Sequence, residues 1–158
     1  MKIAIVSGKD EGPSKLNAFD NALLKAGIGD VNLIKVSSML EKETELVNLP
    51  KLKAGSMINC VLSTITSEKQ GDKITAAIAI ALGENLGCVV ENSDINKDSE
   101  DVINDSIAMV KYMMEKRKEE IQEIIVKEEI HVVENIGSVV AAVVYLEWLK
   151  WFKWKNLI

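Results

Sequence analysis

Histidine and cysteine are scarce in this sequence, which limits the chemistry that the chain can perform. Its 158 residues include one histidine, His131, and two cysteines, Cys60 and Cys88. A histidine-dependent catalytic triad, or a metal site with several histidines, is therefore nearly excluded within one chain. The two cysteines lack metal-ligand spacing and allow at most one disulfide, so we expect buried free thiols in a reducing compartment. If the protein is an enzyme, its electrophile must come from elsewhere.

Long apolar runs and basic clusters are also missing. The apolar start, 1–6, is too short for a signal peptide, and no segment has the uninterrupted apolar length needed to cross a bilayer. The formal net charge is -5, and basic residues gather only near the C-terminus, which argues against nucleic acid as a partner. We therefore expect a cytoplasmic protein with neither nucleic acid nor a membrane as partner.

The residues that are present predict one α+β domain. Alternating residues predict strands at 31–36 and 121–133, and a long Val/Ala run predicts one at 136–145. Further strands are predicted at 3–6, 56–66 and 86–91. The segment 73–82 is ambiguous because its alanines would also suit a buried helix, but its alternation favours a strand. Helices are predicted from Lys15 to about Gly27 and over 99–118, and loops over 7–13 and 39–55. This order lacks regular strand–helix alternation and favours two sheets packed face to face with helices outside.

Asp20 is the first candidate for a functional residue. On a helical wheel it falls in the stripe formed by Leu16, Phe19, Leu23 and Leu24. A carboxylate on a packed face costs free energy unless it meets a donor or a cation. Backbone amides or a lysine of the protein could satisfy it, or it could await a positively charged ligand.

The strand predicted over 31–36 runs directly into a serine pair, Ser37 and Ser38. Such a pair is usually no more than a polar exit from a sheet. The surrounding sequence changes this reading, because LNAFDNALLKAGIGDVNLIKVSS at 16–38 closely resembles the pyruvoyl-dependent arginine decarboxylases. The resemblance runs from about Ile3 to Tyr145 and includes GDKITAAI at 71–78 and ENIG at 134–137.

The resemblance implies that the chain cuts itself. Ser38 would attack the carbonyl of Ser37, and a bent, strained peptide would help it to reach back. The products would be a beta chain, 1–37, and an alpha chain, 38–158, that begins with a pyruvoyl group derived from Ser38. This covalent group would form a Schiff base with the substrate and would replace a metal or pyridoxal phosphate. The uncut chain would then be a zymogen, and the missing electrophile would come from the chain itself.

The resemblance also suggests roles for five further residues. Asn32 would lie near the cut and donate its amide to the scissile carbonyl, although it could also be a simple ladder residue. Glu91, which follows a buried strand, would be partly buried and return a proton to the substrate, although it could equally be a solvated strand-end glutamate. Asp20 would receive the guanidinium group, and Gly29 and Val31 would line the same pocket through their backbones.

The family fold would be a layered α/β/β/α sandwich of mainly antiparallel sheets, assembled as a homotrimer or hexamer with active sites between subunits. The activity would be conversion of L-arginine to agmatine and CO2 in polyamine biosynthesis. The same chemistry on another amino acid, or an uncleaved structural or regulatory paralogue, stays open. The sequence departs from the family pattern in the strand that starts at 56, at Glu41-Lys42, and at the C-terminus, where Trp148, Trp151, Phe152 and Trp154 predict an amphipathic tail.

Overall fold

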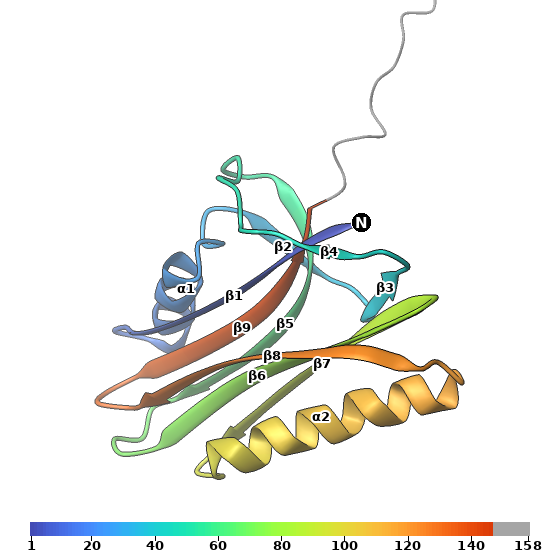
Figure 1. Ribbon diagram of the computed structural model, residues 1–158. Helices are drawn as coiled ribbons and strands as arrows, with labels where there is room; N and C mark the ends of the chain where they lie inside the picture. Colours follow the sequence, from blue (N-terminus) through green and yellow to red (C-terminus); the bar gives the residue numbers. More distant parts are fainter. Residues whose placement is uncertain (147–158) are drawn as a thin grey trace, which may run out of the picture.

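The computed structural model describes residues 1–146 and is shown in Figure 1. Over these residues the chain forms nine strands and two helices. In chain order they are β1 (Lys2–Glu11), α1 (Lys15–Lys25), β2 (Asn32–Lys35), β3 (Met39–Glu41), β4 (Glu45–Leu46), β5 (Met57–Ser67), β6 (Lys73–Gly83), β7 (Leu86–Ile95), α2 (Ser99–Lys116), β8 (Ile121–Val132) and β9 (Gly137–Tyr145). The predicted tryptophan-rich tail lies outside the described residues. None of the helices described is long and apolar enough to cross a membrane.

The strands form two sheets that pack face to face. One sheet has the order β2-β5-β9-β1-β4 and the other the order β3-β7-β6-β8. Pairing is antiparallel except between β1 and β4 and between β2 and β5. Helix α1 covers the outer face of the five-stranded sheet, and α2 covers the outer face of the four-stranded sheet (Figure 1). The predicted α/β/β/α sandwich of mainly antiparallel sheets is therefore confirmed.

The core between the sheets comes from the alternation that the sequence shows. Along β6, Ile74, Ile78 and Ile80 face the five-stranded sheet, whereas Ala79 and Ala81 face α2. The ambiguous segment is thus a strand whose alanines make room for a helix on one side. Both cysteines are buried and free, as expected, and burial raises the pKa of Cys60 to about 11.

Strand β1 is longer than the sequence suggested, because the predicted loop over 7–13 is strand as far as Glu11. The glycine that we took for a loop residue, Gly8, has a packing role instead. A Cβ atom on Gly8 would lie 2.3 Å from the backbone oxygen of Ala22, and one on Gly12 would lie 2.4 Å from the backbone nitrogen of Ala18. Glycine therefore lets the backbone of α1 lie directly on β1.

This close approach also corrects the predicted face of α1. The buried residues Ala18, Ala22 and Leu23 form the packed side, whereas Leu16 and Leu24 are exposed. Asp20 is exposed as well, in line with these two leucines. The predicted loop over 39–55 is also wrong in part, since it contains β3 and β4.

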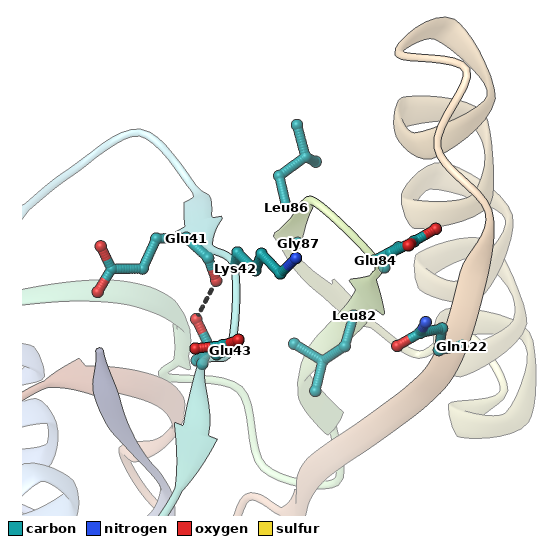
Figure 2. A pocket seen from close by; sticks show the side chains of 10 residues that line it. Glu41, Lys42, Glu43, Leu82, Glu84, Leu86, Gly87 and Gln122 are labelled. Atoms are coloured by element: carbon teal, nitrogen blue, oxygen red, sulfur yellow. Dashed lines mark hydrogen bonds between the residues drawn. The ribbon is translucent and has the colours of Figure 1, made fainter.

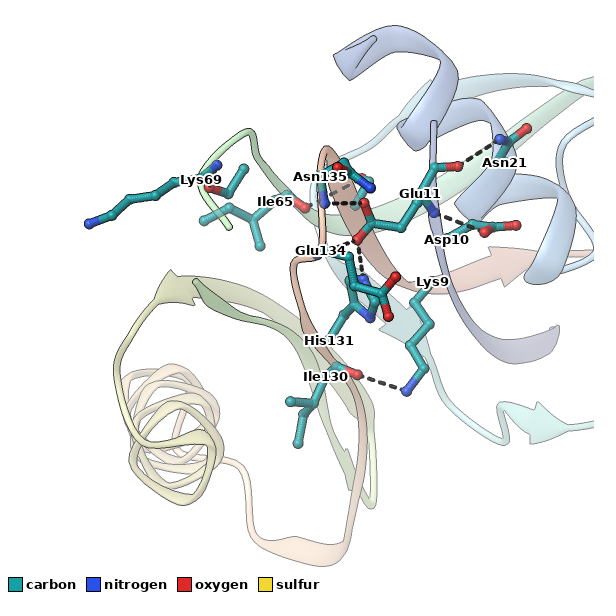
Figure 3. Close-up of polar contacts among 12 residues, drawn as sticks. Lys9, Asp10, Glu11, Asn21, Ile65, Lys69, Ile130, His131, Glu134 and Asn135 are labelled. Atoms are coloured by element: carbon teal, nitrogen blue, oxygen red, sulfur yellow. Dashed lines mark hydrogen bonds and ion pairs between the residues drawn. The ribbon is translucent and has the colours of Figure 1, made fainter. Parts of the chain in front are cut away.

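A polar cluster fastens β1 to the connection between β8 and β9 (Figure 3). The carboxylate of Glu11 shares a hydrogen bond with the His131 ring and accepts the backbone N–H groups of Glu134, at 3.1 Å, and Asn135, at 3.0 Å. Burial opposes ionisation of Glu11, but these hydrogen bonds outweigh it and lower the pKa of Glu11 below its ordinary value of 4.5. The chain's one histidine therefore holds two distant segments together.

Candidate functional site

The serine pair lies where the chain crosses from one sheet to the other. Before the pair, the backbone N–H of Val36 donates to the carbonyl of Cys60 in the five-stranded sheet, at 3.1 Å. After it, the carbonyl of Ser38 accepts the N–H of Val89 in the four-stranded sheet, at 2.9 Å. The peptide bond between Ser37 and Ser38 is thus held at both ends by different sheets.

The backbone bends sharply at this crossing. The N–H of Met39 donates to the carbonyl oxygen of Ser37, at 3.1 Å, which closes a three-residue turn centred on Ser38. Ser38 is not among the residues with positive φ, so the turn is of the common inverse kind. The expected bend is present, but this geometry gives no sign of strain. The carbonyl that would be attacked already accepts one hydrogen bond.

A cavity of about 300 Å³ opens beside the crossing. Within the described chain, β2 pairs with β5 only as far as Cys60, and β3 pairs with β7 only as far as Cys88. Beyond these points both inner strands have open edges, and the cavity lies between them. Its lining is largely polar: Lys35, Leu62, Ser63, Thr64, Glu91, Asn92 and Ser93.

Two residues with hydroxyl groups line this cavity from β5. Ser63 Oγ donates to the carbonyl of Asn92, at 2.5 Å, and so joins the two sheets at their open edges. Thr64 Oγ1 is buried and has no hydrogen-bond partner among the described residues. This buried oxygen lies on the opposite face of β5 from Val61 and Ile65, which pack between the sheets, so it is not exposed to the cavity. Sequence reasoning missed both residues, because β5 also contains Asn59, Thr66 and Ser67 and the Ser-Thr pair does not stand out among them.

Glu91 lines the cavity from β7, near the serine pair. Ser38 bonds to Val89, two residues before Glu91 along the same strand. The expected partial burial of Glu91 is wrong for the single chain, because its side chain is exposed at the open edge. Its exposure lets it reach a molecule bound in the cavity.

The residues expected to bind the substrate lie elsewhere. Asp20 is on the outward side of α1, and Val31 packs beneath that helix. A Cβ atom on Gly29 would lie 2.6 Å from Cδ2 of Leu24, which places Gly29 against the same helix. These three residues therefore form a group near α1, and none of them lines the cavity that contains Glu91.

Asn32 also points away from the cut in its own chain. Its Nδ2 donates to the carbonyl of Gly55, at 3.0 Å. Ser37 is five residue steps further along an extended chain, a span of roughly 16 Å, so a bond from Asn32 to Ser37 within this chain is not formed.

Comparison with known proteins identifies the family. A sequence model of pyruvoyl-dependent arginine decarboxylase matches residues 2–150. The chain belongs to this family. It is 61% identical over 147 residues to the pyruvoyl-dependent arginine decarboxylase of Methanothermobacter thermautotrophicus, covering 93% of this chain and 97% of that protein. The proteins of the same name from Pyrococcus furiosus and Methanocaldococcus jannaschii are 41% and 37% identical; these matches cover 90% and 89% of this chain, and 93% and 86% of those proteins.

Membership of the pyruvoyl-dependent arginine decarboxylase family makes the chain a decarboxylase that depends on a pyruvoyl group. The crossing at Ser37 and Ser38 fits the formation of such a group, because a serine hydroxyl follows a carbonyl that already accepts an N–H. The neighbouring cavity is lined by Glu91 on the side where the new chain end would lie.

A second cavity, of about 280 Å³, lies at the far end of β3 (Figure 2). Glu41, Glu43 and Glu84 line it together with Lys42, and Thr44 Oγ1 closes the turn by donating to the Glu41 carbonyl, at 2.6 Å. None of the candidate site residues of this family member lines it, and we assign it no part in the chemistry.

Proposed function

We propose that this chain is a self-cleaving arginine decarboxylase that converts L-arginine to agmatine and CO2, a step toward polyamines. The observation that carries the proposal is the crossing at Ser37 and Ser38, where both flanking segments are fixed and the scissile carbonyl accepts the N–H of Met39. The names of the relatives support arginine as the substrate.

The cut consumes one water molecule and needs a base to take the proton from the Ser38 Cα. Ser38 Oγ bonds to the carbonyl carbon of Ser37, and the bond from that carbon to the Ser38 nitrogen breaks, while the hydroxyl proton passes to the nitrogen. The resulting ester is eliminated: the Ser38 Cα loses its proton and Ser37 leaves as a carboxylate. Water then converts the dehydroalanine to pyruvoyl and releases ammonia. The products are segments 1–37 and 38–158.

A pyruvoyl group supplies a carbonyl that accepts the electrons released when an amino acid loses CO2. The residues of the chain must then bind the substrate and return a proton to its α-carbon. Glu91 is suited to this proton transfer because it faces the cavity beside the cut from a firmly paired strand.

The guanidinium group would bind to Asp20 of a second subunit. Within one chain Asp20 lies on α1 and Glu91 faces a separate cavity, so a site that uses both needs two chains. Leu16 and Leu24, which are 73% and 49% exposed on either side of Asp20, would be covered in such a contact. A homotrimer or hexamer with sites between subunits meets both needs, and Asn32 could then act on a neighbour's cut.

An intact mass spectrum under denaturing conditions tests the proposal first. We expect two fragments divided after Ser37, with the larger blocked by pyruvoyl. In a separate assay, the cut protein should release CO2 from arginine in preference to lysine or aspartate. Self-cleavage together with decarboxylation of another amino acid would show that arginine is not the substrate. A single uncut chain after long incubation would favour a structural or regulatory paralogue.

A further inference from the structure

The hydroxyl group of Tyr145 holds the residue that follows the serine pair. Tyr145 ends β9, and its Oη donates to the carbonyl oxygen of Met39, at 3.2 Å. The same Met39 donates its N–H to the carbonyl of Ser37. Tyr145 is thus connected to the scissile carbonyl through one intervening residue.

The β-sheet pattern leaves the backbone N–H and C=O of Met39 available to bond to Ser37 and Tyr145. In antiparallel pairs, hydrogen-bonded and non-hydrogen-bonded residues alternate. Ser38 bonds to Val89, so Met39, which lies opposite Cys88, is at a non-hydrogen-bonded position. Its N–H and C=O therefore point together away from β7, on the edge strand of the sheet.

Tyr145 is a firm support for this contact. Its backbone pairs with Ile3 of β1, and the next residue, Leu146, donates its N–H to the carbonyl of Lys2, at 3.0 Å. Its side chain packs against the core between the sheets. Burial raises the pKa of Tyr145 to about 12, so the hydroxyl stays protonated and remains a donor at neutral pH.

We propose that Tyr145 is a positioning residue for self-cleavage, which holds Met39 so that the Met39 N–H stays on the Ser37 carbonyl oxygen. This inference rests on the proposed self-cleavage. When Ser38 Oγ attacks, that oxygen takes up the electron pair of the carbonyl bond and becomes negative, before the bond to the Ser38 nitrogen breaks. An N–H already in place stabilises this charge without rearrangement. Tyr145 touches no reacting atom and acts through Met39.

Tyr145→Phe tests this role because it removes one hydroxyl group and keeps the ring. Tyr112→Phe is the matched control, since Tyr112 lies on α2 and is 59% exposed. Freshly translated chains are followed by mass spectrometry. We expect Tyr145→Phe to slow the cut by about tenfold, the effect of one lost hydrogen bond, and Tyr112→Phe to leave it unchanged. Turnover per pyruvoyl group, measured on the fraction already cut, should match the wild type.

Hydroxylamine shows whether the acyl shift or the later elimination is slowed, because it cleaves the ester intermediate directly. A slowed acyl shift leaves little ester, so hydroxylamine should not restore cleavage of Tyr145→Phe. Replacing Met39 by its α-hydroxy acid analogue removes the N–H itself and should slow the cut by roughly a hundredfold.

The role of Tyr145 would be overturned if Tyr145→Phe cut itself at the wild-type rate. It would also be overturned if hydroxylamine restored cleavage, or if the cut fraction lost its turnover of substrate. A Tyr145→Phe chain that fails to fold by circular dichroism would overturn it too, by making Tyr145 a structural residue. A wild-type chain that never cuts would instead reject the proposed function.

Discussion

The backbone N–H of Val89 donates to the carbonyl oxygen of Ser38, at 2.9 Å, and so ties the residue that would become the new chain end to the four-stranded sheet. This bond uses only backbone atoms. The side chain of Ser38 is therefore free for chemistry, and its removal should leave the fold intact.

Ser38→Ala should accordingly stay one uncut chain, because no other group at position 38 can attack the Ser37 carbonyl. Its unfolding temperature should be close to that of the wild-type chain before cleavage, since the backbone bond from Val89 to Ser38 remains. Ser37→Ala is the matched control: position 37 contributes its carbonyl, so this variant should still cut. Mass spectrometry of both variants decides, and a cut in Ser38→Ala would refute the nucleophile assignment.

Asp20→Asn should weaken the binding of arginine while leaving self-cleavage intact. The variant keeps the shape of the side chain but loses the charge that pairs with a guanidinium group. A hydrogen bond to a charged group contributes about 1.5–3 kcal/mol, so KM should rise by roughly tenfold to a hundredfold. Asp101→Asn, which removes an exposed carboxylate on α2, is the control. An unchanged KM in Asp20→Asn would show that the guanidinium group binds elsewhere.

Much of the fold could be predicted from the sequence, because strands buried on one face carry a period of two. The strands β6 and β9 are buried on both faces, and they are predicted instead from alternating large and small residues in β6 and from a continuous Val/Ala run in β9. The helix over 99–118 matches α2 closely. Errors arose where a glycine served packing rather than a turn. Gly8 resembles a loop residue, yet it continues β1 because α1 needs its bare backbone.

The site was harder to predict than the fold. The serine pair stands out in the sequence, but the cavity beside it depends on where β2 and β3 stop pairing with their neighbours. The separation of Asp20 from Glu91 is likewise invisible in a linear motif, since it follows from α1 and β7 lying in different layers. The contact between Tyr145 and Met39 joins residues 106 positions apart, and no local pattern predicts it.

Mixing two impaired chains should restore activity at low arginine concentration if the site needs two subunits. Co-expression of Asp20→Asn with Glu91→Gln would place some intact Asp20 groups opposite intact Glu91 groups, and random assembly in a ring gives roughly a quarter of wild-type sites. Either variant alone should cut itself; Glu91→Gln should turn over about a hundredfold to ten-thousandfold more slowly. The control is co-expression of Asp20→Asn with a chain that carries both Asp20→Asn and Glu91→Gln. This mixture contains no intact Asp20, so it should restore no activity. Equal activity in the two mixtures would place the whole site in one chain.

Glu11→Gln should weaken the junction between the segments 1–37 and 38–158, which the carboxylate joins through His131, Glu134 and Asn135. The pKa of Glu11 is lowered in the folded chain, so its stabilising contribution is present above the ordinary value of 4.5 and is lost as pH falls through the folded value.

In the uncut Ser38→Ala background, Glu11→Gln should therefore lower stability at pH 7 by about 1 kcal/mol, or roughly 2–4 °C in Tm. The difference should shrink as pH falls through the lowered pKa of Glu11, where the carboxylate of the parent chain becomes protonated and loses its charge. Glu134→Gln is the control, because Glu134 contributes its backbone N–H and its side chain is exposed. A Tm difference that stays constant from pH 7 down to the lowest pH at which the chain folds would mean that the charge on Glu11 does not stabilise this junction. In the cut protein the same variant should release segment 1–37 at a lower urea concentration, since only non-covalent contacts then retain it.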